Sequence, residues 1–125
     1  MSKKKILIVE DNTFVSLQLE YILKQDYEVH TATDGSTAVD MIQTYLQPDA
    51  IITDISMPGY TGWELLSIVK AKFSLKHIPV LVLTAGKRKS NFIKGIQLGA
   101  SDFMTKPFTS SYILSRVQEL VNRAA

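Results

Sequence analysis

The chain has 125 residues, of which 46% are hydrophobic and 21% are charged, and its formal net charge is +2. These values are typical of a globular protein, and the length fits one domain, residues 1–125, with a well-buried core. The sequence contains no cysteine. Disulfides, thiolate metal sites and thiol catalysis are therefore excluded.

The first apolar run follows a basic start and stops at the acidic pair Glu10–Asp11. It is too short for the core of a signal peptide or for a membrane span. We therefore expect a cytoplasmic protein that makes no membrane contact.

Charge is distributed unevenly along the chain. Residues 1–64 carry ten Asp or Glu and four Lys, whereas residues 65–125 carry ten Lys or Arg and two acidic residues. Such asymmetry indicates either a binding face for an acidic partner or a solvated Lys-rich surface. Both interpretations stay open at this point.

The first half of the sequence predicts strands and helices in alternation. In chain order they are strand Lys5–Val9, helix Phe14–Lys24, strand Tyr27–Ala32, helix Ser36–Leu46 and strand Ala50–Asp54. Asn12 and Thr13 are favourable N-cap residues, and Asp34–Gly35 indicates a turn. The third strand is a short apolar run rich in β-branched residues, so we expect it to be buried on both faces, with Asp54 at its solvent end.

The second half continues the alternation after a loop, Ile55–Thr61, where Pro58, Gly59 and the following Gly62 are turn formers. In chain order the predicted elements are helix Trp63–Phe73, strand Val80–Leu83 ending at Thr84, helix Ser90–Leu98, strand Asp102–Met104 and helix Thr109–Asn122. Five strands alternating with five helices predict a doubly wound α/β fold with a parallel sheet. The alternation alone does not fix the strand order.

Polar residues follow four of the predicted strands. Their positions are Glu10–Asp11 after the first strand, Asp54 at the end of the third, Thr84 after the fourth and Lys106 after the fifth. The carboxyl ends of parallel strands lie along one edge of the sheet, so these side chains are expected to share one crevice.

Three crowded carboxylates favour a bound cation that relieves their repulsion. An all-oxygen ligand set selects a hard ion, Mg²⁺ or Mn²⁺, and Mg²⁺ often shares its shell with a phosphoryl oxygen. Lys106 and Thr84 are suited to hold further phosphoryl oxygens, and an aspartate can form an aspartyl phosphate. The residues therefore predict phosphoryl transfer onto Asp54.

In order along the chain, Glu10–Asp11, Asp54 with Met57-Pro58-Gly59 and Gly62, Thr84–Ala85 and Lys106-Pro107-Phe108 resemble the receiver domain of bacterial response regulators. The resemblance covers the chain from Lys4 to Val121. It implies the flavodoxin-like or CheY-like strand order 2-1-3-4-5. It also implies a domain that is not a conventional enzyme. From the length of the chain we expect no output domain in it.

The resemblance also implies roles for individual residues. Asp54 is expected to be phosphorylated, and the metal would be held by Asp11, Asp54 and the backbone carbonyl of Ser56, with Glu10 acting largely through water. Lys106 would bind the phosphoryl group, and its peptide bond to Pro107 is expected to be cis. Thr84 would move toward the phosphoryl group, and Phe103 would swing inward as a coupled aromatic switch.

The predicted function is a phosphorylation-controlled signalling module. The resemblance implies that its phosphoryl donor is a sensor histidine kinase or a histidine phosphotransfer protein. It also implies that an unknown downstream protein binds the face formed by the fourth helix, the fifth strand and the fifth helix.

Other functions fit the residues less well. A phosphatase with an aspartyl intermediate would want a second acid near Asp54, where the sequence has Ser56. An FMN carrier would need a phosphate-binding loop where Glu10–Asp11 stands. Direct nucleic-acid binding would rest on four clustered cations without flanking aromatics, which give at most weak, salt-sensitive affinity.

The basic cluster consists of Lys87, Arg88, Lys89 and Lys94. We interpret it as a partner face, with solvated charge as the alternative. Asp102 and Arg116 occupy positions that pair across dimers in one receiver subfamily. The other charges of such dimers are not evident, so we expect a monomer, with a phosphorylation-driven dimer as the alternative.

Overall fold

The computed structural model describes residues 3–57, 59–72, 74–85 and 89–124, without the side chains of residues 89–92 and 124. Its elements in chain order are β1 Lys5–Val9, α1 Thr13–Leu23, β2 Glu28–Ala32, α2 Gly35–Thr44, β3 Ala50–Asp54, α3 Gly62–Ala71, β4 Val80–Thr84, α4 Lys89–Leu98, β5 Asp102–Thr105 and α5 Ser110–Ala124. Every predicted element is present, and its ends differ from the prediction by at most two residues.

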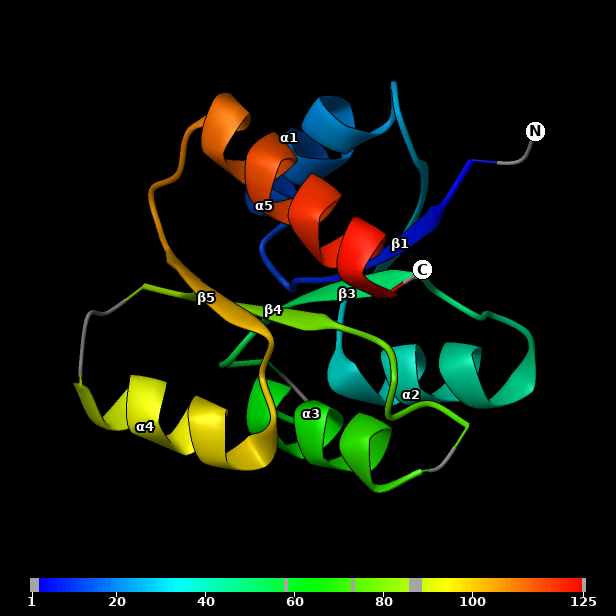
Figure 1. Ribbon diagram of the computed structural model, residues 1–125, viewed down its shortest axis with the longest axis vertical. Helices are drawn as coiled ribbons and strands as arrows, with labels where there is room; N and C mark the ends of the chain where they lie inside the picture. Colours follow the sequence, from blue (N-terminus) through cyan, green and yellow to red (C-terminus); the bar gives the residue numbers. More distant parts are fainter. Residues whose placement is uncertain (1–2, 58, 73, 86–88, 125) are drawn as a thin grey trace.

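The strands form one five-stranded sheet in the order β2-β1-β3-β4-β5, and all neighbouring strands are parallel. This order confirms the expected doubly wound α/β fold. Figure 1 shows α1 and α5 on one face of the sheet and α2, α3 and α4 on the other. The central strand β3 lies between β1 and β4, so Asp54 ends the strand with neighbours on both sides.

Two hydrophobic cores lie on the two faces of the sheet, because successive side chains of a strand point to opposite faces. In β1, Leu7 and Val9 pack with residues of α2 and α3, whereas Ile6 and Ile8 pack with residues of α1 and α5. All four side chains are fully buried. A strand covered on both faces needs a continuous apolar run, which is the pattern that the sequence has in β1, β3 and β4.

Polar side chains cap the first three helices at the same edge of the sheet. Asn12 Oδ1 accepts from Val15 N at 3.1 Å, and Asp34 Oδ1 accepts from Thr37 N at 2.7 Å. Thr61 begins α3 with a capping box. Asp34 was predicted to form a turn with Gly35. It is instead the N-cap of α2, with Gly35 as the first helical residue.

Glycines shape the loop between β3 and α3. Gly59 has φ of +74°, a conformation that favours glycine. Gly62, predicted as a turn former, is the first residue of α3 and lies against the end of β3. A Cβ atom at Gly62 would overlap the carbonyl oxygen of Asp54 and lie 2.9 Å from Ile55 Cα. The absence of a side chain at Gly62 therefore lets α3 approach the site strand closely.

Within the described ranges, no helix has both the length and the apolar character needed to cross a membrane.

Candidate functional site

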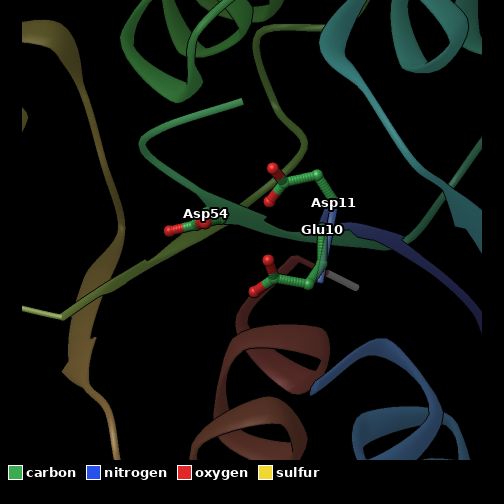
Figure 2. A group of neighbouring side chains, drawn as sticks. All are labelled: Glu10, Asp11 and Asp54. Atoms are coloured by element: carbon green, nitrogen blue, oxygen red, sulfur yellow. The ribbon is translucent and has the colours of Figure 1, made fainter. Parts of the chain in front are cut away.

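Three carboxylates meet at the carboxyl ends of β1 and β3 (Figure 2). Glu10 and Asp11 directly follow β1, and Asp54 is the last residue of β3. One ligand oxygen from each residue lies within 4.8 Å of the other two. The structure thus brings together the three acidic residues that the sequence predicted to share one crevice.

Glu10 is buried, with a relative exposure of 1%. Its Oε2 accepts from the backbone N–H of Asn12 at 3.2 Å, and its Oε1 lies 2.8 Å from Lys106 Nζ. The contact of Oε1 with the Lys106 ammonium is an ion pair. Burial raises the pKa of Glu10, an effect that the contact with Lys106 only partly offsets.

Lys106 follows β5, and its ammonium lies between two of the carboxylates. Its Nζ is 2.8 Å from Glu10 Oε1 and 3.5 Å from Asp54 Oδ2. Burial would lower the pKa of Lys106, but the contacts with Glu10 and Asp54 outweigh that effect and raise it. The lysine is therefore held in its charged form. The Lys106–Pro107 peptide bond is cis.

Asp54 has one oxygen tied to the backbone and one directed to the crevice. Oδ1 accepts from the backbone N–H of Ile55 at 2.8 Å, whereas Oδ2 faces Lys106. The side chain keeps 14% of its surface exposed. Asp54 therefore combines a fixed orientation with access from solvent, which a nucleophilic carboxylate needs.

The hydroxyl residue and the aromatic residue of the predicted switch lie on neighbouring strands. Thr84 is buried at the end of β4, and its carbonyl accepts from the backbone N–H of Lys106 at 2.9 Å. Phe103, in β5, is partly buried and packs against the core on the α2–α3 side of the sheet. Ser56 lies in the turn after β3.

The donor set fits a hard divalent cation. Glu10, Asp11 and Asp54 offer only oxygen ligands within 4.8 Å of one another, which is the preference of Mg²⁺ and Mn²⁺. Among the described residues, this is the one acidic or histidine cluster with metal-ligand spacing.

The predicted partner face is described only in part. Lys87 and Arg88, and the side chain of Lys89, lie outside the described residues. Lys94 is exposed, and its Nζ lies 5.5 Å from the centre of the Trp63 ring in α3.

Two contributions to the site were not found from the sequence. Asn12 was predicted as a helix cap, but its backbone N–H also fixes the carboxylate of Glu10. Gly62 was predicted as a turn former, whereas it provides the close approach of α3 to Asp54. For Gly62, the signal available in the sequence was a glycine at the start of a predicted helix.

The family model of the response regulator receiver domain matches residues 6–118. The chain belongs to the response regulator receiver family. Receiver domains are the signalling switches of two-component systems rather than conventional enzymes, and they bind a divalent metal at an acidic cluster. The sheet order and the positions of the three carboxylates agree with this membership.

Solved structures of receiver domains share the whole fold. A Chloroflexus aurantiacus protein described as a response regulator is 35% identical, with 97% of this chain and 99% of that chain covered and a TM-score of 0.91. The chemotaxis response regulator CheY4 of Vibrio cholerae is 31% identical over 95% of this chain and 99% of its own, with a TM-score of 0.88. The receiver domain of a Syntrophus aciditrophicus signal transduction histidine kinase is 32% identical, covering 95% and 90%, also with a TM-score of 0.88.

Proposed function

We propose that this receiver domain accepts a phosphoryl group on Asp54 from the phosphohistidine of a sensor histidine kinase or a histidine phosphotransfer protein. The observation that carries the proposal is the position of Asp54 Oδ2. This oxygen lies in an acidic cluster and 3.5 Å from the ammonium of Lys106. A carboxylate placed beside a fixed cation is suited to attack phosphorus and to hold the anion that forms.

The transfer exchanges one bond to phosphorus for another. The carboxylate oxygen of Asp54 forms an O–P bond while the N–P bond of the phosphohistidine breaks, and the leaving imidazole takes a proton from solvent. The backbone N–H of Ile55 keeps its bond to Oδ1 and holds the plane of the carboxylate. Oδ2, which faces the crevice, is therefore the oxygen that we assign as nucleophile.

Mg²⁺ or Mn²⁺ would be held by Asp11, Asp54 and the backbone carbonyl of Ser56, with Glu10 acting largely through water. When bound, the ion supplies positive charge to the phosphoryl oxygens. Mg²⁺ fits because it keeps several waters and is commonly held by few carboxylates together with phosphate oxygens.

Lys106 supplies the remaining charge. Its ammonium is shared by Glu10 and Asp54, and a phosphoryl group on Asp54 would bring further anionic oxygens close to it. The hydroxyl of Thr84, at the end of the adjacent strand β4, is the donor that we assign to another phosphoryl oxygen. We assign the readout to α4, β5 and α5, whose altered surface would bind the downstream protein.

The test is to incubate the protein with Mg²⁺ and acetyl phosphate and to measure its intact mass. We expect one phosphoryl adduct, and we expect Asp54→Asn to lose it. Asp49→Asn is the matched control, because Asp49 precedes the same strand at its opposite end and accepts from Lys5 N at 2.7 Å. An adduct that survives Asp54→Asn, or no adduct on the unsubstituted protein, would contradict the proposal.

A second measurement tests the donor class. A histidine kinase or phosphotransfer protein that carries a labelled phosphoryl group on its histidine should transfer that group to the unsubstituted protein and to Asp49→Asn. It should not transfer the group to Asp54→Asn. Transfer from acetyl phosphate without transfer from any phosphohistidine protein would leave Asp54 as the acceptor and overturn the assigned donor.

A further inference from the structure

The ring of Phe103 lies against the backbone of helix α4 at Gly95. A Cβ atom added at Gly95 would overlap the tip of the ring and lie 2.5 Å and 2.9 Å from its Cε1 and Cε2 atoms. Real Cβ atoms do not approach other atoms this closely. The ring therefore occupies space that only a glycine at position 95 leaves free.

The sheet places this contact beside the phosphorylation site. Phe103 of β5 is the register partner of Val82 in β4, and Thr84 lies two residues after Val82. Because neighbouring register partners and alternate residues share a face, Phe103 and Thr84 lie on the same face of the sheet. That face is the one covered by α2, α3 and α4 (Figure 1).

Few of the described side chains of α4 pack against the rest of the protein. Ile93 and Ile96 are 46% and 70% exposed, whereas Gly95 is buried and Leu98 packs against the core. Lys94 contacts α3 through the Trp63 ring. Among residues 93–98, the buried surface of the helix is thus centred on Gly95 and on the ring beneath it.

We propose that Gly95 is a positioning residue that seats Phe103 under α4, so that the placement of α4 follows the placement of the ring. The proposal rests on the proposed function, because it specifies how a change at Asp54 and Thr84 reaches the partner face. With the ring in its seat, α4 lies close to the sheet. A Cβ atom at position 95 would force the ring or α4 to move.

Helix propensity and packing predict opposite effects of Gly95→Ala, which makes the sign of the change informative. Alanine is a better helix former than glycine, so propensity alone would raise the melting temperature. Collision with Phe103 would lower it. We expect Gly95→Ala to melt at a lower temperature than the unsubstituted protein. We expect Gly95→Ala/Phe103→Ala, which lacks the ring, to melt at a higher temperature than Phe103→Ala.

Trp63 reports the position of α4. It is the only tryptophan of the chain, and Lys94 of α4 lies over its ring. We expect Gly95→Ala to shift Trp63 emission in the unphosphorylated protein, and Gly95→Ala/Phe103→Ala to show the emission of Phe103→Ala alone. Gln97→Ala, at an exposed position of the same helix, is the control and should change nothing.

The phosphorylated proteins separate coupling from simple packing. Each variant is treated with Mg²⁺ and acetyl phosphate, and intact mass confirms the adduct before Trp63 emission is read. We expect the emission to change on phosphorylation in the unsubstituted protein and in Gln97→Ala, and to lose at least half of that change in Gly95→Ala. An equal change in Gly95→Ala, or none in the phosphorylated unsubstituted protein, overturns the proposal.

A folding failure of Gly95→Ala and a failure of the proposed function can be told apart. If Gly95→Ala does not fold, the double variant must fold, because the ring is the cause of the defect. A double variant that also fails overturns the proposal. If the unsubstituted protein takes no phosphoryl adduct, the proposed function is wrong. The melting and emission measurements on the unphosphorylated proteins still test whether Gly95 positions the Phe103 ring under α4.

Discussion

Lys106 lies closer to Glu10 than to Asp54, with its Nζ 2.8 Å from Glu10 Oε1 and 3.5 Å from Asp54 Oδ2. The sequence predicted this lysine as a ligand of the phosphoryl group. In the structure it also neutralises a buried carboxylate that would otherwise face two further acids. Its charge therefore stabilises the unphosphorylated fold as well as the expected product.

Lys106→Met should destabilise the protein because it leaves the buried Glu10 carboxylate without its cation. The loss of such a partner costs about 1–3 kcal/mol in free energy of unfolding. The loss should depend on pH, because the variant raises the pKa of Glu10 further above the ordinary value of 4.5. A carboxyl with a raised folded-state pKa favours folding when protonated, so stability falls as pH rises through and above about 4.5.

Urea unfolding of Lys106→Met and the unsubstituted protein at acidic and neutral pH checks this prediction. Lys70→Met is a matched control, since Lys70 is a partly buried lysine away from the site, whose Nζ donates to the carbonyls of Lys76 at 3.1 Å and Ile78 at 2.6 Å. It should lower stability by a similar amount at both pH values and leave phosphorylation intact. A pH-independent loss in Lys106→Met would show that Glu10 is not its main partner.

Mg²⁺ should stabilise the folded protein, because the three carboxylates are assembled only in the folded state. At a free concentration of about 100 times the dissociation constant, a ligand that binds only the folded state adds about 2.7 kcal/mol. Thermal unfolding with increasing Mg²⁺, and again after chelation, measures the effect. A melting temperature that does not respond to Mg²⁺ would contradict the metal site.

Asp11→Asn tests the same site without creating a buried unpaired group, because Asp11 is exposed. The variant should fold normally, respond to Mg²⁺ only at much higher concentration and accept little phosphoryl group from acetyl phosphate. Asp49→Asn, at the opposite end of β3, should keep the full Mg²⁺ response.

Gly62→Ala should impair phosphorylation by displacing the backbone that carries Asp54. The added Cβ would overlap the carbonyl oxygen of Asp54, and a displacement of about 1 Å from the reactive position can cost about 100-fold in rate. The rate of adduct formation with acetyl phosphate measures this effect.

Thr61→Ala is the control for loss of helix α3 stability alone. It removes the N-cap and should cost about 1 kcal/mol of unfolding free energy, while the close approach at Gly62 stays intact. If Thr61→Ala and Gly62→Ala slow phosphorylation equally, the effect of Gly62 comes from the helix and not from its contact with Asp54.

Patterns that are local in the sequence predicted most of the fold. The apolar runs of β1, β3 and β4 are buried on both faces, and Asn12 caps the helix that it precedes. The common edge of the strand ends followed from parallel pairing, so the sequence alone predicted that Glu10, Asp11 and Asp54 lie close together. The strand order came from the family resemblance and not from the alternation of elements.

Contacts between distant elements could not be predicted in the same way. The pairing of Lys106 with Glu10 depends on how far the lysine reaches across two strands. The needs for Gly62 and Gly95 depend on which atoms lie opposite them, the backbone of Asp54 in one case and the ring of Phe103 in the other. No local periodicity encodes these through-space distances, and the residue type was the only signal.

The ion pair between Arg116 of α5 and Asp102 of β5 bears on the oligomeric state. Their positions correspond to a dimer contact in one receiver subfamily, but the structure pairs them within one chain. Arg116 also lies 3.0 Å from Glu119 Oε2. Because both acceptors are in the same chain, the guanidinium already has partners without a second copy.

We therefore expect a monomer in sedimentation velocity, both before and after treatment with Mg²⁺ and acetyl phosphate. Arg116→Ala should cost no more than about 1 kcal/mol, since the pair is partly exposed, and should not change the sedimentation coefficient. Arg123→Ala, on the same helix and more exposed, is the control for loss of a cation. Phosphorylation could instead produce a dimer that Arg116→Ala abolishes and Arg123→Ala preserves. In that case Arg116 and Asp102 must separate and pair between chains, and the expectation of a monomer would be wrong.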